Sequence, residues 1–351
     1  MDDTVSRKTK PGFKLAVAAL LLALCVVILG AFTRLVDAGL GCPDWPVCYG
    51  HVLWPMDEEE VLKANAAFPD TPVDHAKTWP EQVHRLFASS LGVFCIALLI
   101  VAGRQRVQQR DQSMPFKLCI FLLALVILQG LFGMWTVTLK LWPQVVTAHL
   151  LGGFLTLSTI WLLCLRLYHR HWTLRPEHMR SIQSIKPFLW LATVILLLQI
   201  FLGGWTTSNY AALACPDFPR CQNQWLPTMN FAKGFNFSQA IGPNYLGGVM
   251  ESSARTAIHF SHRLGAVLVT LAILLLAWRM SAIPASVRQH WRKLLLGLLC
   301  LQLILGISNV VWSLPLAVAV SHNAVGALLL LTLVGLSHRV YTANVAASTT
   351  V

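Results

Sequence analysis

Two cysteine-containing stretches, LGCPDWPVCYG at residues 40–50 and LACPDFPRCQ at residues 213–222, share one pattern half a chain apart. Each contains Cys-Pro-Asp, an aromatic residue, Pro, one variable residue and Cys. A shift of 173 residues superimposes both cysteines of the first stretch on those of the second. The chain therefore contains an internal duplication, which is a stronger guide to its fold than any single motif.

The duplication extends into the apolar segments on either side of the cysteines. A shift of 178 residues aligns His84 with His262, because the second cysteine-containing loop is the longer one. The shift of 173 residues aligns Gly30 with Gly203, Thr33 with Thr206, Gln129 with Gln302, Gly133 with Gly306, and His149 with His322. The sequence thus predicts two halves in parallel orientation, unlike the inverted repeats of many transporters.

The composition is that of a membrane protein, with 56% hydrophobic and only 12% charged residues. Soluble domains carry about 25% charged residues. A hydrocarbon core of ~30 Å at ~1.5 Å rise per residue needs about 20 apolar residues. Eight apolar runs have roughly that length: 13–36, 82–103, 116–137, 145–167, 187–207, 256–278, 294–313 and 318–340. The first is too long for a signal-peptide core, so we expect a retained helix.

These runs predict an all-α integral membrane protein, with eight transmembrane helices arranged as two tandem, pseudo-symmetric four-helix bundles. The expected N-terminal bundle is 1–167, the cytoplasmic linker is 168–186, and the C-terminal bundle is 187–351.

The net charge of +12 is distributed as a membrane protein distributes it, not as a nucleic-acid-binding protein does. Lys and Arg gather in alternate loops, whereas the first long loop is acidic, with Glu58, Glu59 and Glu60. This bias follows the positive-inside rule. We expect both termini in the cytoplasm, loops 37–80 and 208–253 on the outer side, membrane lipids as partners, and no nucleic acid.

The two cysteine pairs fall in the expected outer loops, where disulfides persist. A five-residue spacer with prolines brings two cysteines within bonding range. We expect disulfides Cys42–Cys48 and Cys215–Cys221. Pairs of free thiols and a thiol-relay role for the first pair stay open, and a zinc site is disfavoured by the spacing.

Four histidines, His84, His149, His262 and His322, fall near the outer ends of the even-numbered apolar runs. Ionisable residues inside a membrane mark functional sites by default. Two facing helices in each half would present one imidazole each, which suits a haem held between two axial ligands. Interhelical hydrogen bonding is the simpler alternative. The other histidines, His51, His75, His169, His171, His178, His290 and His338, are expected at the surface.

The halves differ three residues before the first histidine of each pair, where Glu81 stands in one and His259 in the other. Residues three apart share a helix face. A carboxylate beside a haem can take a proton or stabilise a developing cation, so Glu81 is a candidate catalytic residue. Capping of the second helix is the structural alternative. Arg34, Arg85 and Arg263 are expected to pair with haem propionates or to extend to lipid headgroups.

Taken in order, the motifs EQVHR, TAHLLGG, HFSHRLGA and SHNAVGA, with the paired cysteine loops, resemble the haem A synthase family over nearly the whole chain. The resemblance implies an oxidoreductase that converts haem O to haem A for cytochrome oxidase, by successive hydroxylations that turn the C8 methyl group into a formyl group. It implies a bacterial inner-membrane location.

The resemblance also assigns roles to the candidate residues. His262 and His322 would ligate a permanent haem b, through which electrons leave to an external acceptor that the sequence does not identify. His84 and His149 would face the substrate haem O, with Glu81 assisting oxidation of the methyl group. Haem O synthase is the expected source of substrate, and homo-oligomer formation stays open.

Two other functions fit the same histidines. One is a dihaem b-type membrane cytochrome that takes electrons from quinol, and the other is a haem carrier or oxidase-assembly partner without chemistry of its own. The haems extracted from the purified protein would distinguish them from the enzyme.

Overall fold

The computed structural model describes residues 9–108, 111, 113–168 and 171–345. Among these residues, eight helices are long and apolar enough to cross a membrane, as the apolar runs predicted. They are α1 (Phe13–Leu35), α3 (His75–Gln108), α4 (Phe116–Thr138), α5 (Pro143–Tyr168), α6 (Pro176–Ser208), α8 (Ser252–Arg279), α9 (Ala285–Val311) and α10 (Leu316–Tyr341). The all-α membrane class is therefore confirmed.

The short elements lie in the connections. The two cysteine-containing loops carry α2 (Glu58–Ala67) and α7 (Phe231–Gly234), and the 3-10 helix η1 (Met280–Ala282) follows α8. At the opposite end of the molecule, β1 (Thr173–Leu174) pairs in parallel with β2 (Asn344–Val345). Asp57 caps α2 by accepting from the Glu60 amide at 2.8 Å, and Glu60 accepts from the Met56 amide at 2.9 Å. This reciprocal arrangement resembles a capping box and explains why a helix forms within a polar loop.

Several helices extend beyond the apolar runs that predicted them. Helix α3 begins at His75 rather than near residue 82, and α6 begins at Pro176, inside the expected linker 168–186. A helix of 34 residues such as α3 is about 50 Å long, more than the hydrocarbon core requires. Hydropathy marks only the segment in lipid, so it misses the polar turns that continue each helix.

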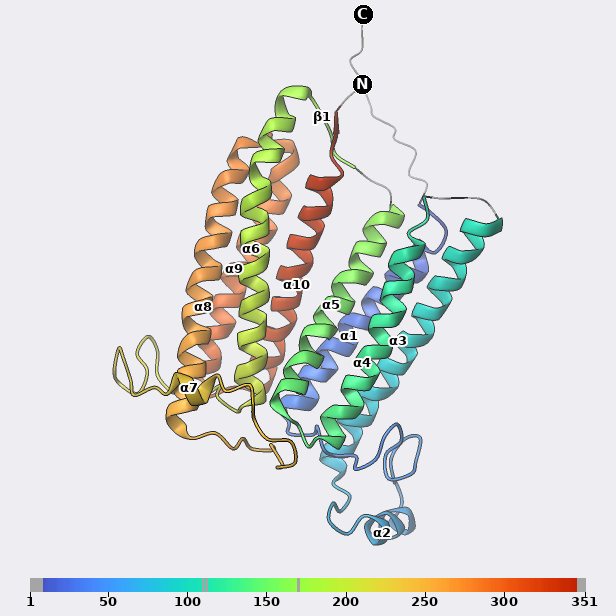
Figure 1. Ribbon diagram of the computed structural model, residues 1–351, viewed down its shortest axis with the longest axis vertical. Coiled ribbons are helices and arrows are strands. Elements are labelled where there is room, and N and C mark those ends of the chain that lie inside the picture. Colours follow the sequence, from blue (N-terminus) through green and yellow to red (C-terminus); the bar gives the residue numbers. More distant parts are fainter. Residues whose placement is uncertain (1–8, 109–110, 112, 169–170, 346–351) are drawn as a thin grey trace, which may run out of the picture.

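The helices of each half pack on one another, as Figure 1 shows. In the N-terminal half α1 and α4 each contact both α3 and α5, and in the C-terminal half α6 and α9 each contact both α8 and α10. The halves meet through α1, α5, α6 and α10. Across this interface the Trp161 indole donates to the Leu331 carbonyl at 2.9 Å.

The cysteine-containing loops lie at one end of the molecule, at the bottom of Figure 1, which we call the cysteine-loop end. There the second loop reaches over to the N-terminal half. The Trp142 indole donates to the Gln239 carbonyl at 3.1 Å, and the Tyr245 amide donates to the Lys140 carbonyl at 3.0 Å. The longer second loop thus ties the two halves together.

Candidate functional site

The two N-terminal histidines face each other near the cysteine-loop end. His84 on α3 and His149 on α5 have ring centroids 6.5 Å apart with an interplanar angle of 89°. A metal–imidazole bond is about 2 Å long, so two imidazoles on opposite sides of one ion have centroids roughly 6 to 6.5 Å apart. The structure therefore brings this predicted pair together at the separation that a shared metal requires.

The C-terminal pair occupies the equivalent helices. His262 lies on α8 and His322 on α10, close enough to interact electrostatically. Four helices thus each contribute one histidine, two in each half, as the repeat predicted.

Each of the four imidazoles rests on a glycine of a neighbouring helix. A Cβ atom added to these glycines would meet Cε1 of the ring at 2.9 Å for Gly30 on His84, 3.7 Å for Gly133 on His149, 3.3 Å for Gly203 on His262 and 3.1 Å for Gly306 on His322. The repeat alignment had paired these glycines, but only the structure shows what they contact. Small residues let helix backbones approach closely in membranes, and here they leave room for the ring.

The polar atoms of the pairs suit a cofactor that brings its own equatorial ligands. Nδ1 is buried without a hydrogen-bond partner in His84, His149 and His322. Among the described residues no group of three or more His, Cys, Asp or Glu side chains is placed to hold a bare metal ion. Two opposed imidazoles without further protein ligands fit a haem, in which the porphyrin supplies the remaining nitrogens.

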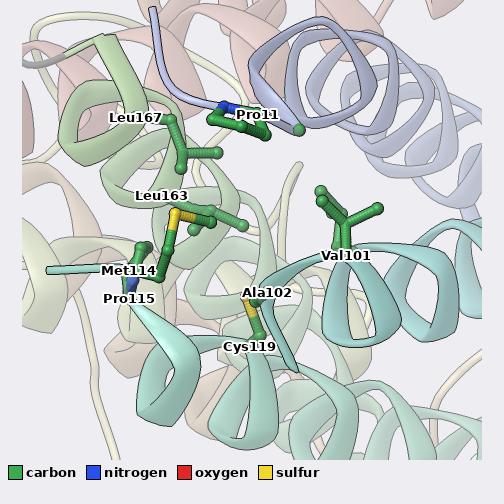
Figure 2. Close-up of a pocket in the computed structure, with 10 residues that line it drawn as sticks. Pro11, Val101, Ala102, Met114, Pro115, Cys119, Leu163 and Leu167 are labelled. Carbon is green, nitrogen blue, oxygen red and sulfur yellow. The ribbon is translucent and has the colours of Figure 1, made fainter. Parts of the chain in front are cut away.

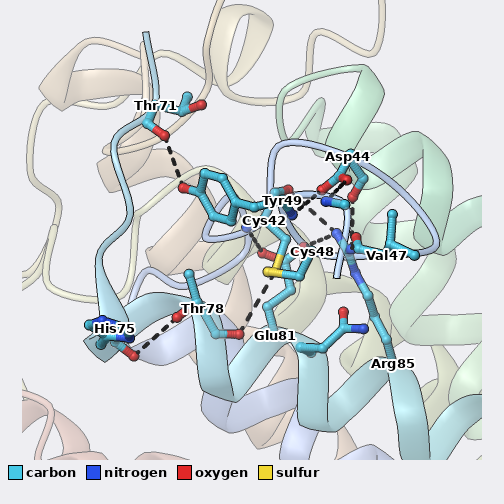
Figure 3. Close-up of a disulfide and its surroundings, with 12 residues drawn as sticks. Cys42, Asp44, Val47, Cys48, Tyr49, Thr71, His75, Thr78, Glu81 and Arg85 are labelled. Carbon is cyan, nitrogen blue, oxygen red and sulfur yellow. Dashed lines mark hydrogen bonds and ion pairs between the residues drawn. A yellow bond between two sulfur atoms is a disulfide. The ribbon is translucent and has the colours of Figure 1, made fainter. Parts of the chain in front are cut away.

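Glu81 is buried against the first cysteine loop, as Figure 3 shows. Its side chain, in a residue only 4% exposed, accepts from the Cys42 amide at 2.9 Å and forms an ion pair with Arg85 at 2.5 Å. Because α3 begins at His75, Glu81 lies inside the helix and is not its cap. The capping alternative for Glu81 is therefore wrong.

The second half repeats this arrangement with an imidazole. His259, also 4% exposed, accepts through Nδ1 from the Cys215 amide at 3.2 Å. Glu81 and His259 thus make the same contact, each with the first cysteine of its loop. The two halves therefore share this hydrogen bond, but the side chain that accepts it is a carboxyl group in one half and an imidazole in the other.

Arg85 on α3 and Arg263 on α8 each donate hydrogen bonds to backbone carbonyls of the cysteine loop in their own half. Arg85 donates to the carbonyls of Asp44 at 2.8 Å and Val47 at 2.7 Å. Arg263 donates to the carbonyls of Cys215 at 2.7 Å, Asp217 at 2.8 Å and Arg220 at 2.8 Å. Neither expectation for these arginines, pairing with propionates or extension to headgroups, describes these contacts.

Both predicted disulfides are present, Cys42–Cys48 and Cys215–Cys221. The aspartate of each Cys-Pro-Asp motif closes the turn. Asp44 accepts from the amides of Tyr49 at 2.6 Å and Gly50 at 2.7 Å, and Asp217 accepts from two amides at the same positions of its loop. Desolvation raises the pKa of Asp217, but hydrogen bonds from the amides of Asn223 and Gln222 and the Arg263 charge together outweigh it, so the pKa is lowered.

Arg34 joins the two halves at the level of the loops. It donates to the Thr207 carbonyl at 2.6 Å, pairs with Asp37 at 3.3 Å and lies 4.0 Å from the Tyr210 ring centroid. Tyr210 in turn donates to Asp37 at 2.9 Å. Arg34 therefore forms an interdomain contact instead of the propionate or headgroup contacts considered from the sequence.

The remaining histidines separate into surface residues and one exception. His338, expected at the surface, is only 7% exposed and lies against His171, with ring centroids 6.3 Å apart. The surface prediction for His338 is wrong because α10 turns this residue toward the linker side of the bundle. His75 and His290 are exposed, and His169 lies outside the described residues.

A small apolar cavity, shown in Figure 2, lies at the end of the N-terminal bundle opposite the cysteine loops, between α3, α4, α5 and the residues before α1. Its volume is about 10 Å³, and Val101, Cys119, Leu163 and Leu167 are among the residues that line it. A space of that size holds one water molecule at most. It offers no room for a cofactor or a substrate.

Eight helices long and apolar enough to cross a membrane, with a histidine pair and a disulfide loop in each half, define a polytopic membrane protein with two related histidine sites. The family model described as "Cytochrome oxidase assembly protein" matches residues 13–334. The chain belongs to this family.

Relatives match over most of the chain. The protein named Heme A synthase in Shewanella oneidensis is 44% identical over 321 residues, 91% of this chain and 93% of that protein. Proteins of the same name from Chelativorans sp. and Halalkalibacterium halodurans are 28% and 26% identical, over 87% and 88% of this chain and 84% and 90% of their own lengths.

Proposed function

We propose that this protein is a haem A synthase of the bacterial inner membrane, an oxidoreductase that converts haem O to haem A. The family, the 44% identical relative of that name and the opposed rings of His84 and His149, with a second histidine pair at the repeat positions, support this function. In the proposed reaction the C8 methyl group of haem O becomes a formyl group through successive hydroxylations. Electrons leave to an external acceptor, and both termini lie in the cytoplasm.

The observation that carries the proposal is the difference between Glu81 and His259. Both residues sit under a disulfide loop, three residues before a histidine, but only Glu81 is a carboxylate. A dihaem cytochrome that only transfers electrons has no use for this difference, whereas oxidation of a methyl group requires a site that can accept protons.

The proposed roles follow the two halves, with 1–167 as the substrate bundle, 168–186 as the linker and 187–351 as the haem b bundle. His262 and His322 would hold haem b, which supplies one-electron redox chemistry when bound. His84 and His149 would position haem O, and Glu81 would take a proton released as the methyl group is oxidised. The Arg85 guanidinium would keep Glu81 oriented.

The experiment purifies the protein from membranes that contain haem O, extracts its haems and separates them by chromatography. Wild type should yield haem b together with haem O or haem A. E81Q keeps an acceptor for the Cys42 amide but removes the charge, so it should retain haem b and form no haem A. Haem b alone in wild type would favour the cytochrome, and normal haem A formation by E81Q would reject the role given to Glu81.

A further inference from the structure

Gln199 on α6 distinguishes His262 from the other three histidines. Its Nε2 lies 3.1 Å from Nδ1 of His262 and donates to the His262 carbonyl at 2.9 Å. In the other three histidines Nδ1 is buried and has no partner. Among the four histidines, His262 is therefore the one whose Nδ1 is contacted by a side chain. That contact leaves its other ring nitrogen, Nε2, available to bind a metal.

The repeat shows that this contact belongs to one half only. The residue equivalent to Gln199 is Val26 on α1, whose side chain has no polar atom, so that only its backbone can hydrogen-bond to His84. A second difference accompanies the first. The Gln199 amide occupies the space in which a Cβ atom of Gly265 would lie, and the residue equivalent to Gly265 is Phe87. The C-terminal half thus has Gln199 with Gly265, and the N-terminal half has Val26 with Phe87 at the same two positions.

The second C-terminal histidine also has a glutamine. Gln302 on α9 places Nε2 3.2 Å from Nε2 of His322. Its repeat equivalent, Gln129 on α4, lies over Gly152, and its Nε2 is buried without a partner. Both C-terminal histidines are therefore contacted by an amide, and neither N-terminal histidine is contacted by one.

An amide at Nδ1 holds a ligating imidazole in place. Histidines that bind metals almost always use their second ring nitrogen for a hydrogen bond, which fixes the tautomer and the ring orientation and raises the basicity of the ligand. An imidazole that ligates a metal through Nε2 carries its proton on Nδ1, so the Gln199 amide would hold it with Oε1 as the acceptor. Oε1 is buried without a partner here, and rotation of the amide exchanges it with Nε2.

We propose that Gln199, in the space left by Gly265, is the positioning residue that makes the His262 site retain its haem permanently. The Val26–Phe87 combination gives the His84 ring a hydrogen bond to the Val26 backbone but no side-chain amide, so that the first site can exchange substrate for product. This inference rests on the proposed function for the nature of the two haems. The contacts that carry it do not depend on that function.

The test measures retention of haem b by the purified, haem-loaded protein, as the rate of haem transfer to excess apomyoglobin. Q199M keeps the length of the side chain and removes the hydrogen bond. Partners of metal-ligating histidines contribute about 10- to 100-fold to metal affinity, so haem b should leave Q199M about 10- to 100-fold faster. Its midpoint potential should rise, because a less basic ligand stabilises the ferric state less. Wild-type kinetics and potential in Q199M would overturn the proposal.

A second variant reaches the same contact from another helix. G265A introduces a Cβ atom where the Gln199 amide lies, so the flexible end of that side chain must move away from His262. It should reproduce the faster haem loss and the raised potential of Q199M. L198A is the matched control, since Leu198 is 58% exposed beside Gln199 and should leave both quantities at their wild-type values. Haem loss from L198A equal to that from Q199M would reduce Gln199 to a packing role and overturn the proposal.

The reciprocal exchange tests the other half. V26Q/F87G should give the first site a glutamine with space beside it, and more haem O or haem A should then co-purify and leave more slowly. Unchanged departure of these haems would contradict the proposed origin of exchange. Failure of the proposed function can be distinguished from failure of the Gln199 proposal. Wild-type protein that forms no haem A would disprove the function, and the rate of haem b loss from Q199M would still test the role of Gln199.

Discussion

The N-terminal and C-terminal halves share a scaffold and differ in a few residues that touch it. Each half has two histidines on glycines, a disulfide loop closed by an aspartate, and an arginine that clamps the loop. They differ at the position three residues before the first histidine, which is Glu81 in the N-terminal half and His259 in the C-terminal half. They differ again where Val26 and Phe87 replace Gln199 and Gly265.

This comparison separates binding from chemistry. Under the proposed function, features present twice are those that both haem sites require, since each site would hold an iron macrocycle between two imidazoles. Features present once must account for what one half does and the other does not. The unshared carboxylate and the unshared amide are therefore the residues that best distinguish a reacting site from a retaining site.

Exchange of the unshared residues should give the largest effect. E81H places in the first half the residue of the second, and it removes the carboxylate proposed to accept protons. Loss of a general base costs about 10²- to 10⁴-fold in rate, so haem A formation should fall by that factor while haem b remains bound. Chromatography of extracted haems measures both. Haem A at the wild-type level would show that the carboxylate has no part in the reaction.

The two arginine clamps should differ in their contribution to stability. R85A leaves Glu81 buried without its cation, whereas R263A removes hydrogen bonds to loop carbonyls and to the neutral His259 ring but no ion pair with a buried carboxylate. Removing one partner of a buried ion pair costs about 3–5 kcal/mol, so R85A should lower the melting temperature more than R263A does. Thermal unfolding in detergent measures this difference. Equal shifts in the two variants would indicate that Glu81 is not held by Arg85.

The disulfides should contribute about equally to stability and unequally to activity. Closing so short a loop is worth about 2 kcal/mol, for C42S/C48S and for C215S/C221S alike. Only the first pair adjoins Glu81, through the Cys42 amide. Haem A formation should therefore fall further in C42S/C48S than in C215S/C221S at equal haem b content. The reverse order of activities would contradict the role of the first loop in positioning Glu81.

A small pH effect should appear in the second loop. The folded pKa of Asp217 is depressed, so its stabilising contribution is present above the unfolded value of about 3.9 and is lost as the pH falls through the folded value. Hydrogen exchange of the Gln222 and Asn223 amides should accelerate in that acidic range relative to D217N, which lacks the transition. Identical pH profiles would show that this carboxylate does not close the turn.

Much of the fold was predictable because the repeat and the hydropathy record it directly. The histidine positions and the disulfides followed from residues that recur at a fixed shift. The ends of α3 and α6 did not, since polar turns outside the hydrocarbon carry no hydropathy signal. Nor did Arg34, whose contacts with Thr207 and Tyr210 join elements far apart in the sequence.

Within the site, the sequence identified the candidate ligands but not the residues that contact them. Gly30 and Gly203 were aligned by the repeat, yet small residues in membrane helices serve many purposes, and only coordinates show a ring against them. The contact between Gln199 and His262 was missed for the same reason. The available signal was the mismatch of Gln199 with Val26, together with that of Gly265 with Phe87.

The central claim, that each half clamps one haem between two histidines, is tested most directly by counting haems in paired variants. Extracted haems should be quantified per polypeptide for wild type, H84A/H149A and H262A/H322A. We predict that H262A/H322A loses haem b, and that H84A/H149A keeps haem b but no longer co-purifies with haem O or haem A. Equal haem content in all three proteins would contradict the account.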